Sequence, residues 1–444
     1  MIRIVLTAAA CLWAAAASAA VEVQEVTTEA GFEAWLVEEP SIPFVSLELR
    51  FKGGASLDPE GKRGVTNLMT GLLEEGAGDL DARAFAQAKE ALAATFHYDA
   101  GDDALAITAQ VLTENRDAAM ALLRESLLEP RFDADAIERV KAQVMSSIQS
   151  DQTDPDAIVG KEAMRILYGD HPYGSAKKGT TDSVAALTRD DIVAAWQAAL
   201  ATDRVYIAAA GDISAEELSA LVDTLLAGLP KVGPALPDAV EVSTAAETVV
   251  VPFETPQSVA LFGHRAIPRD DPDFFAAFVM NQVLGAGGFE SRLMEEVRDK
   301  RGLTYGVYSY IANRDYSDMM MGRVASANDR IAEAIAVIRD EWRRMAEEGV
   351  TEEELEAAKT FLTGAYPLRF DGNGAIANIL VGMQMQDLTP DYIATRNDRV
   401  EAVTVADVRR VAARVMLPEE LLFVVVGQPE GLEDARVVAP VVTQ

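Results

Sequence analysis

The sequence predicts an α+β fold of two homologous domains, each with a mainly antiparallel sheet and helices packed on one face. The first observation is an internal repeat, because the same number of residues, 216, separates Thr188 from Thr404 and Gly211 from Gly427. Each threonine opens a helix and each glycine ends a strand. The second observation is the order of the segments: half-buried strands come first in each half and amphipathic helices follow them.

Two further pairs of segments recur at nearly the same spacing. The strand expected over residues 44–51 matches one expected over 258–265, and the helix around residues 137–141 matches the helix around 355–359. A period this long indicates two copies of a whole domain and not a solenoid of short repeats.

The repeat places the domain boundaries. We expect a signal peptide over residues 1–20, an N-terminal domain over 21–230, a linker over 231–247 and a C-terminal domain over 248–444. The linker contains one glycine and two prolines, which favour a connecting segment over a helix or strand.

The first 20 residues have the composition of a secretory signal peptide. They contain one basic residue (Arg3), an apolar run and the small-residue pattern Ala17-Ser18-Ala19. We therefore expect export and a periplasmic location, while a lipoprotein anchored through Cys11 is a minor alternative. The apolar run is too short and too rich in alanine to predict a membrane span, and no later stretch is long enough.

The composition excludes several kinds of partner and site. With 39 basic and 71 acidic residues the net charge is −32, and such a surface repels nucleic acid and anionic lipid. Cys11 is the only cysteine, so the mature protein has no thiol ligand and relies on its core for stability. His97, His171 and His264 are too far apart to share a helix face, which argues against an ordinary zinc site.

No motif of nucleophilic catalysis or nucleotide binding stands out. The segment 175–178 matches S-x-x-K, but it follows a turn and lacks the partner motifs. G-x-S-x-G does not occur, and Glu290 stands where a dinucleotide-binding loop needs its third glycine. Taken alone, these residues do not define a catalytic centre.

The stretch from Leu284 to Tyr310 is the most distinctive part of the sequence. It predicts a glycine-rich turn, a helix over about 291–301 that ends at Gly302, and a strand over 303–310. Arg298 in the last helical turn and Tyr305 early in the strand could then point at one spot. On spacing alone, a cation at a helix end and a packed tyrosine are the favoured interpretation.

Several motifs resemble the pitrilysin/insulinase-type metallopeptidases, in the short-chain branch that includes the mitochondrial processing peptidase. The resemblance covers nearly the whole mature sequence and includes the duplicated helix and strand described above. Its motifs are Gly53-Gly54 followed by Gly64, the segment 167–174 (LYGDHPYG), and the stretch from Ser291-Arg292-Leu293 through Gly302-Leu303-Thr304-Tyr305.

The resemblance implies that this chain lacks the zinc site of the family. Catalytic members bind zinc through an H-x-x-E-H helix and a glutamate on a later helix. The matching positions here are Asn67, Thr70 and Gly71, and the later helix, 140–150, contains no carboxylate. We therefore expect that this chain binds no metal.

The resemblance assigns a role to the second half. An arginine and a tyrosine, here Arg298 and Tyr305, hold the substrate backbone and stabilise the tetrahedral intermediate in related enzymes. Gly287, Gly288 and Phe289 are expected to bind substrate beside them. Each such chain forms half of a clamshell.

The resemblance predicts that this chain is the non-metal subunit of an exported heterodimeric peptidase. A partner with H-x-x-E-H would hold the zinc, and a peptide or unfolded protein would bind between the subunits as an added β-strand. One alternative is a pseudoenzyme that binds peptides or scaffolds a complex without contributing to catalysis. Another is a hydrolase that is active alone through an unrecognised site.

Overall fold

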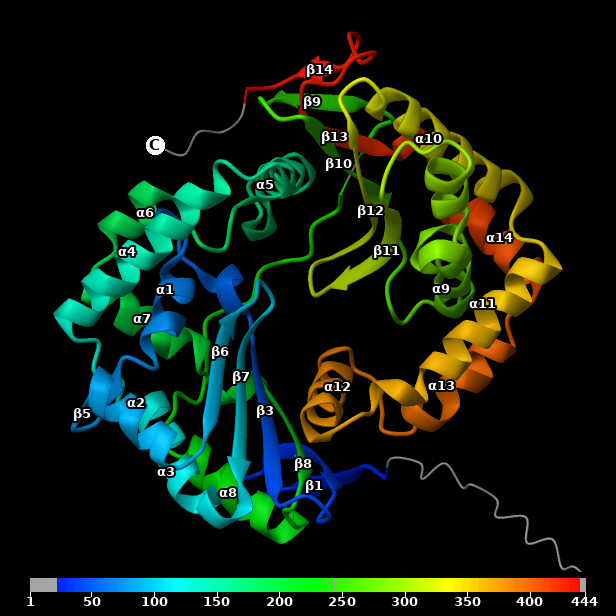
Figure 1. Ribbon diagram of the computed structural model, residues 1–444. Coiled ribbons are helices and arrows are strands. Elements are labelled where there is room, and N and C mark those ends of the chain that lie inside the picture. The colour runs from blue at the N-terminus through cyan, green and yellow to red at the C-terminus, as the bar shows by residue number, and fades with distance from the viewer. Residues whose placement is uncertain (1–21, 243, 440–444) are drawn as a thin grey trace, which may run out of the picture.

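Each half of the chain folds around a six-stranded mixed sheet (Figure 1). The computed structural model describes residues 22–242 and 244–439, so the predicted signal peptide lies outside the described residues. Within the described ranges no helix is long and apolar enough to span a membrane.

The first sheet has the strand order β1-β2-β8-β3-β7-β6. Its only parallel pair in the described structure joins β2 and β8, and the other neighbours are antiparallel. The strands in this order are β1 (Gln24–Thr27), β2 (Glu33–Glu38), β8 (Val205–Gly211), β3 (Phe44–Lys52), β7 (Ala104–Leu112) and β6 (Thr95–Ala100).

The second sheet repeats this order as β9-β13-β10-β12-β11, with β14 added in parallel beside β9. Again β9 and β13 are parallel while the pairs β13-β10, β10-β12 and β12-β11 are antiparallel. The strands are β9 (Thr248–Pro252), β13 (Leu422–Gly427), β10 (Gln257–Arg265), β12 (Ser317–Ala327), β11 (Val307–Arg314) and β14 (Arg436–Val437). The equal order in both sheets confirms the predicted duplication.

The repeated landmarks have the same local structure in both halves. Thr188 and Thr404 each cap a helix through a reciprocal capping box with an aspartate three residues later. Gly211 and Gly427 end the paired strands with positive φ, and a Cβ at either position would lie 2.2 Å or 2.3 Å from an oxygen of the neighbouring strand. The close approach explains why both strands end in glycine.

Helices cover one face of each sheet, as predicted, and bury the two main cores. Those of the first half are α1 (Val65–Leu72), α2 (Ala82–Ala91), α3 (Arg116–Leu128), α4 (Ala134–Asp151), α6 (Thr181–Ala186), α7 (Arg189–Ala199) and α8 (Ala215–Leu226). Those of the second half are α9 (Phe274–Asn281), α10 (Ile331–Glu348), α11 (Glu352–Ala365), α13 (Tyr392–Glu401) and α14 (Val405–Val415).

The opposite face of each sheet is covered by one helix from the other half. Helix α5 (Pro155–Tyr168) of the first half packs on β10 and β13, and α12 (Asn373–Met385) of the second half packs on β2, β3 and β8. Both helices lie toward the middle of the molecule, and most of the others lie outside (Figure 1). The sequence pattern predicted helices on one face of each sheet only, so this exchange of helices was not predicted.

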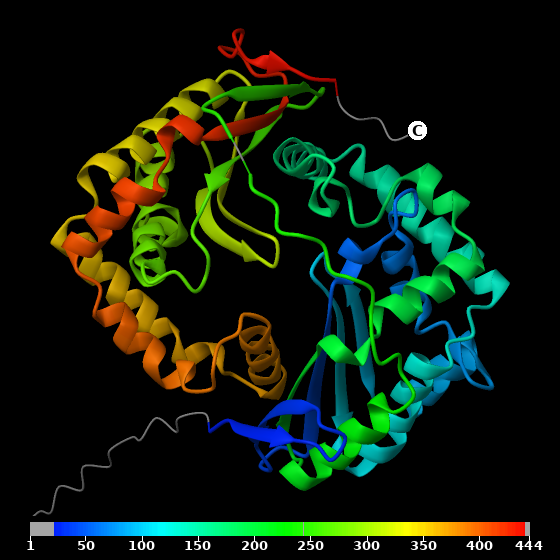
Figure 2. The same ribbon diagram turned by 180° about the vertical axis from the view of Figure 1, so that it is seen from behind.

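The segment between α8 and β9 connects the two halves. Its described residues form no helix or strand, and it runs through the middle of the molecule, as the view from behind shows (Figure 2). The Val240 amide donates to the Tyr316 carbonyl at 2.8 Å, and Leu236 packs against the cluster under α5. The connector is therefore part of the contact between the halves.

Two hairpin ends meet where the halves join. Arg314, at the end of β11, forms an ion pair with Asp102 between β6 and β7, and its guanidinium lies 3.7 Å from the centre of the Tyr173 ring. Lys52 forms a second ion pair across the same boundary, 3.4 Å from Asp315. Segment 167–174, noted for its family resemblance, thus lies in the contact between the halves.

A buried histidine ties α10 to the second sheet. His264 on β10 is fully buried, and its Nε2 accepts a hydrogen bond from the Trp342 indole at 2.8 Å. Because the indole can only donate, Nδ1 carries the proton and donates to the Arg265 carbonyl at 2.7 Å. Burial lowers the pKa of His264 from 6.5 to about 4.

This histidine predicts a loss of stability in mild acid. The pKa of His264 in the folded state lies below the unfolded value. Its contribution to the free energy of unfolding is therefore complete above pH 6.5 and falls as the pH drops toward 4. The loss from this one group amounts to about 3 kcal/mol. In denaturant titrations at several pH values, His264→Gln should flatten the slope of stability between pH 6.5 and 4. The exposed His97 is the control, and an equal flattening in His97→Gln would contradict the assignment.

Candidate functional site

The helix aligned with the zinc motif is packed against a neighbouring helix. On α1 the Thr70 hydroxyl donates to the Thr66 carbonyl at 2.7 Å, within its own helix. A Cβ added to Gly71 would lie 3.2 Å from a methyl group of Val140 on α4. An amide, a hydroxyl and a glycine offer no imidazole or carboxylate, so these residues do not fit a zinc ion. Among the described residues, no group of three His, Cys, Asp or Glu side chains could hold a metal.

The position of the later helix in the family's metal site corresponds to α4. This helix extends beyond the stretch 140–150 that was matched in the sequence. Its one carboxylate beyond residue 140 is Asp151 at the C-terminal end. Lys178 lies 2.8 Å from this carboxylate and also donates to Ser147 at 2.9 Å. An ammonium group therefore binds this end of α4.

Arg298 lies in a short π-helical segment, Met294–Asp299, within the helix that the sequence predicted. Gly302 has φ near +60°, and its amide donates to the Arg298 carbonyl at 2.7 Å, as predicted for the residue that ends this helix. The Arg298 side chain is 36 % exposed and pairs with Asp299 at 3.1 Å. Its guanidinium also lies 4.8 Å from the centre of the Phe289 ring. Arg298 thus points partly into solvent beside an aromatic ring.

Tyr305 lies before the strand and not within it, so the predicted strand placement is wrong. The cause is Thr304, whose hydroxyl donates to the Ala325 carbonyl of β12 at 2.6 Å and accepts from the Gly306 amide at 3.0 Å. This side chain takes the place of a ladder bond and delays β11 until Val307. Leu303 and Val307 are buried, whereas Tyr305 is 90 % exposed.

The glycine-rich turn brings backbone close to its surroundings. A Cβ on Gly287 would lie 2.7 Å from the Gln282 carbonyl, and Gly288 has φ near +59°, so both positions favour glycine. Phe289 follows them and is 68 % exposed. The three predicted substrate-binding residues therefore present backbone and one aromatic ring at the surface.

The described contacts bring only some of the predicted residues together. Arg298 and Phe289 are joined by the cation–π contact, while Tyr305 forms no hydrogen bond or ring contact with either one among the residues that the structure describes. All three flank the same turn and helix, which precede the edge strand β11.

Sequence reasoning did not identify the residue that anchors this element. Arg292 is 6 % exposed and forms two hydrogen bonds with Glu354 on α11, at 2.6 and 2.7 Å, and one with the Gly349 carbonyl at 2.9 Å. Burial raises the pKa of Glu354, but Arg292 and the Thr351 cap outweigh it and lower that pKa to about 2. The sequence signal for a buried ion pair was a charged residue, Arg292, between Ser291 and the buried Leu293.

Strand β11 is an edge strand with an exposed aromatic face. In the described structure it pairs only with β12, so half of its backbone hydrogen-bonding groups lack a strand partner. Tyr308 and Tyr310 are exposed on one face with ring centres 6.2 Å apart, while Val307 and Ser309 are buried on the other. Such an edge can pair with an extended peptide.

Two family profiles match the chain in succession. One, described as insulinase (peptidase family M16), matches residues 34–181, and the other, described as the peptidase M16 inactive domain, matches residues 186–362. Together they span both halves of the structure.

Similar proteins agree with these matches. The crystal structure of a peptidase M16 inactive domain from Pseudomonas fluorescens is 30% identical, with a TM-score of 0.86 over 94% of this chain and 99% of that chain. The non-peptidase homolog YmxG of Helicobacter pylori is 29% identical over 75% of this chain and 77% of its own length. An uncharacterized zinc protease of Streptomyces coelicolor is 26% identical over 89% of this chain and 87% of its own length.

The profiles, the shared fold and the identity to the Pseudomonas structure confirm the resemblance seen in the sequence: the chain belongs to peptidase family M16, the insulinase family, and has no H-x-x-E-H motif.

Proposed function

We propose that this chain is the non-metal subunit of an exported, two-chain zinc peptidase. A partner of the same family with an H-x-x-E-H motif holds the zinc ion. This chain supplies Arg298 and Tyr305, and the two subunits enclose an extended peptide or unfolded protein like the halves of a clamshell. The signal-peptide pattern of residues 1–20 supports a periplasmic location for the complex.

The exposure of Tyr305 carries the proposal. A tyrosine ring normally packs, yet this one is 90 % exposed between the buried Leu303 and Val307. The Thr304 hydrogen bonds hold the backbone out of the sheet at this point. A phenol held at the surface beside an edge strand is well placed to meet a bound peptide, and a subunit that only filled space would not need it.

The chemistry of peptide hydrolysis explains how such a subunit contributes without a metal. A zinc ion held by the H-x-x-E-H residues of the partner would supply an activated water molecule for attack on the peptide carbonyl. The oxyanion that develops still needs preorganised donors, and a phenol and a guanidinium are suitable groups. Gly287, Gly288 and Phe289 bind the substrate beside them. Strand β11 offers the part of its edge beyond Ser309 to the peptide backbone, because the Val307 amide and the Ser309 carbonyl are bonded within the chain.

The main test is a variant of Tyr305 in the assembled complex. Tyr305→Phe removes one donor hydroxyl and should reduce turnover about 100- to 1000-fold, with assembly unchanged by size-exclusion chromatography. Tyr308→Phe on the same edge is the matched control and should retain turnover. Arg298→Ala should raise KM through weaker substrate binding, whereas Arg343→Ala at an exposed position should not.

Full activity in both Tyr305→Phe and Arg298→Ala would overturn the catalytic role. A family relative named a non-peptidase homolog is 29% identical over 75% of this chain, so that result would favour a pseudoenzyme that binds peptides or scaffolds a complex.

A second test concerns the metal. The residues on α1 do not fit zinc, so the purified chain should contain far less than one zinc ion per molecule by elemental mass spectrometry, and it should cleave no peptide. Adding the H-x-x-E-H partner should confer activity that a zinc chelator abolishes. Zinc-dependent hydrolysis by the pure chain would contradict the proposal.

A third test concerns the anchor of the Arg298 element. Arg292→Met leaves the Glu354 carboxylate without its partner and should reduce the free energy of unfolding by about 3 kcal/mol. Turnover in the complex should also fall, since the helix carrying Arg298 loses its attachment to α11. Arg343→Met removes an exposed ion pair and should cost less than about 1 kcal/mol. Equal stability of the two variants in denaturant titrations would exclude the anchoring role of Arg292.

A further inference from the structure

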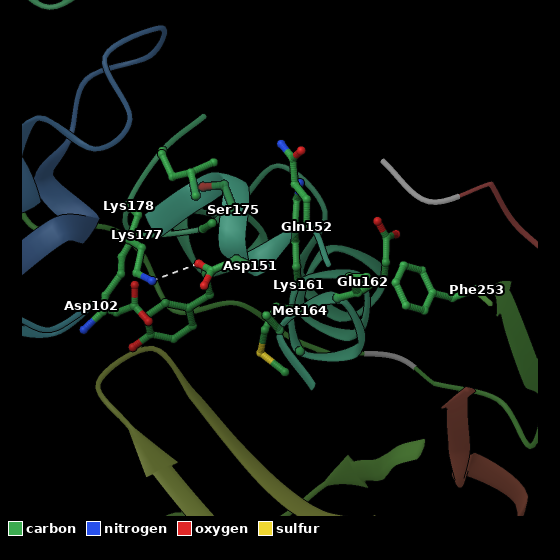
Figure 3. A pocket seen from close by; sticks show the side chains of 17 residues that line it. Asp102, Asp151, Gln152, Lys161, Glu162, Met164, Ser175, Lys177, Lys178 and Phe253 are labelled. Atoms are coloured by element: carbon green, nitrogen blue, oxygen red, sulfur yellow. Dashed lines mark hydrogen bonds and ion pairs between the residues drawn. The ribbon is translucent and has the colours of Figure 1, made fainter. Parts of the chain in front are cut away.

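A cavity of the described structure lies away from the Arg298 element. It has a volume of about 540 Å³ and lies between α5, the C-terminal end of α4 and the loop that follows Tyr173 (Figure 3). Phe253, just after β9, adds a side chain from the second half. Ligand sites in proteins typically have volumes of about 300 to 1,000 Å³, so this cavity is large enough for a small molecule.

A glycine inside a helix keeps the cavity open. Gly160 lies in the middle of α5 and lines the cavity, although glycine in a helix interior costs about 1 kcal/mol relative to alanine. Apart from its two neighbours in the chain and the backbone of its own helix, no atom lies within 4 Å of the place where its Cβ would be. Packing within the protein therefore does not require glycine here, and the missing side chain leaves room for a ligand.

The lining is apolar in one part and cationic in another. Ile148, Ile158, Met164 and Phe253 provide apolar surface, and Figure 3 shows Phe253 at the end opposite Lys177 and Lys178. Three of the ten lysines in this acidic chain line the cavity: Lys161, Lys177 and Lys178. Such a concentration of ammonium groups is unusual for a protein with a net charge of −32.

The carboxylates of the lining are paired with arginines or lysine. Asp102 forms ion pairs with Arg63 and Arg314, and Glu162 pairs with Arg165 at 2.9 Å. Asp151 pairs with Lys178 at 2.8 Å.

The nearest carboxylate to the Lys177 ammonium in an ion pair is Asp99, which is well exposed and 3.9 Å away. This ammonium can therefore accept a closer anionic partner. Burial also lowers the pKa of Lys161, so an anion in the cavity would favour its charged form.

We propose that this cavity binds an aliphatic carboxylate, with the hydrocarbon chain over Gly160 and Phe253 and the carboxylate at Lys177 and Lys178. The apolar walls remove the chain from water, and the two ammonium groups provide charge-assisted hydrogen bonds to the head group. Because walls from both halves meet here, a bound molecule also links α5 to the second half. The site does not depend on the proposed peptidase role, since it involves neither Arg298 nor Tyr305.

The test uses the purified chain and three probes, and the two probes with a dodecyl chain are kept below their micelle-forming concentrations. Dodecanoate should bind in a saturable manner with one site per chain by isothermal titration calorimetry and should raise the melting temperature. Acetate has only the head group, dodecyltrimethylammonium has the opposite charge, and neither should bind. Equal binding of dodecyltrimethylammonium would reduce the site to a non-specific apolar surface and overturn the proposal.

Two variants test the site directly. Gly160→Leu places a side chain in the cavity at a position where a Cβ meets no neighbour, and it improves helix propensity, so the protein should remain folded while dodecanoate binding is abolished. Lys177→Gln should weaken dodecanoate binding about tenfold through the loss of one charge-assisted hydrogen bond. Lys231→Gln, at an exposed position in the connector, is the matched control and should bind normally.

Unchanged affinity in Gly160→Leu would overturn the proposal, as would the absence of dodecanoate binding to the unmodified chain. A short apolar peptide that binds the cavity when dodecanoate does not would point instead to peptide capture.

Discussion

The exchange of one helix between the halves is the constraint on which the rest of the structure depends. Both sheets have apolar side chains on two faces, and the helices of one half cover only one of them. In β13 the side chains of Phe423 and Val425 belong to the core of the second half, while Leu422, Val424 and Val426 face α5. In the absence of α5 and α12 these faces would contact water at a cost of about 25 cal/mol for each Å² of apolar surface. The exchange therefore fixes how the two sheets lie relative to each other.

The fixed arrangement of the two sheets determines where the residues of the proposed site, Arg298 and Tyr305, can lie. The β11–β12 hairpin extends from the second sheet to the boundary, where Arg314 meets Asp102 and Tyr173. Strand β11 is held by β12 along one side and by the Arg314 contact at its end. The π-helical segment with Arg298 is attached to α11 through Arg292 and Glu354, and its Met294 sulfur accepts from the Val307 amide of β11 at 3.4 Å. The start of β11 and the segment with Arg298 therefore support each other, so weakening one of them also affects the other.

Much of the fold could be predicted because its signals are local. A capping threonine with an aspartate three residues later, or a glycine at a strand end, has the same meaning wherever it occurs, and two copies at one offset indicate duplication. The exchanged helices could not be predicted in this way, since a helix does not encode which sheet it packs on. A signal was present, however: the continuous apolar run 421–426 indicates a strand buried on both faces.

The position of Tyr305 could not be predicted for a related reason. Alternation of side chains from 303 to 310 favours a strand throughout, and only the hydrogen bond from Thr304 to Ala325 shows that the strand begins later. This partner is 21 residues away in the sequence, so no local pattern contains it. The later start of the strand leaves the Tyr305 phenol exposed. A tyrosine within the strand would have shared the buried face of Val307 and Ser309.

The residues at the zinc positions of the family, Asn67, Thr70 and Gly71, show how α1 is held in the first half. A vacated ligand set of imidazoles and a carboxylate would leave buried polar groups without partners, which destabilises a fold. Here Thr70 bonds within its own helix and Gly71 allows α4 to approach through Val140. The helix pair therefore holds together by packing alone, and the first sheet still receives α12 and still meets the β11–β12 hairpin. A chain whose α1 residues do not fit a zinc ion can in this way preserve the geometry of the other half.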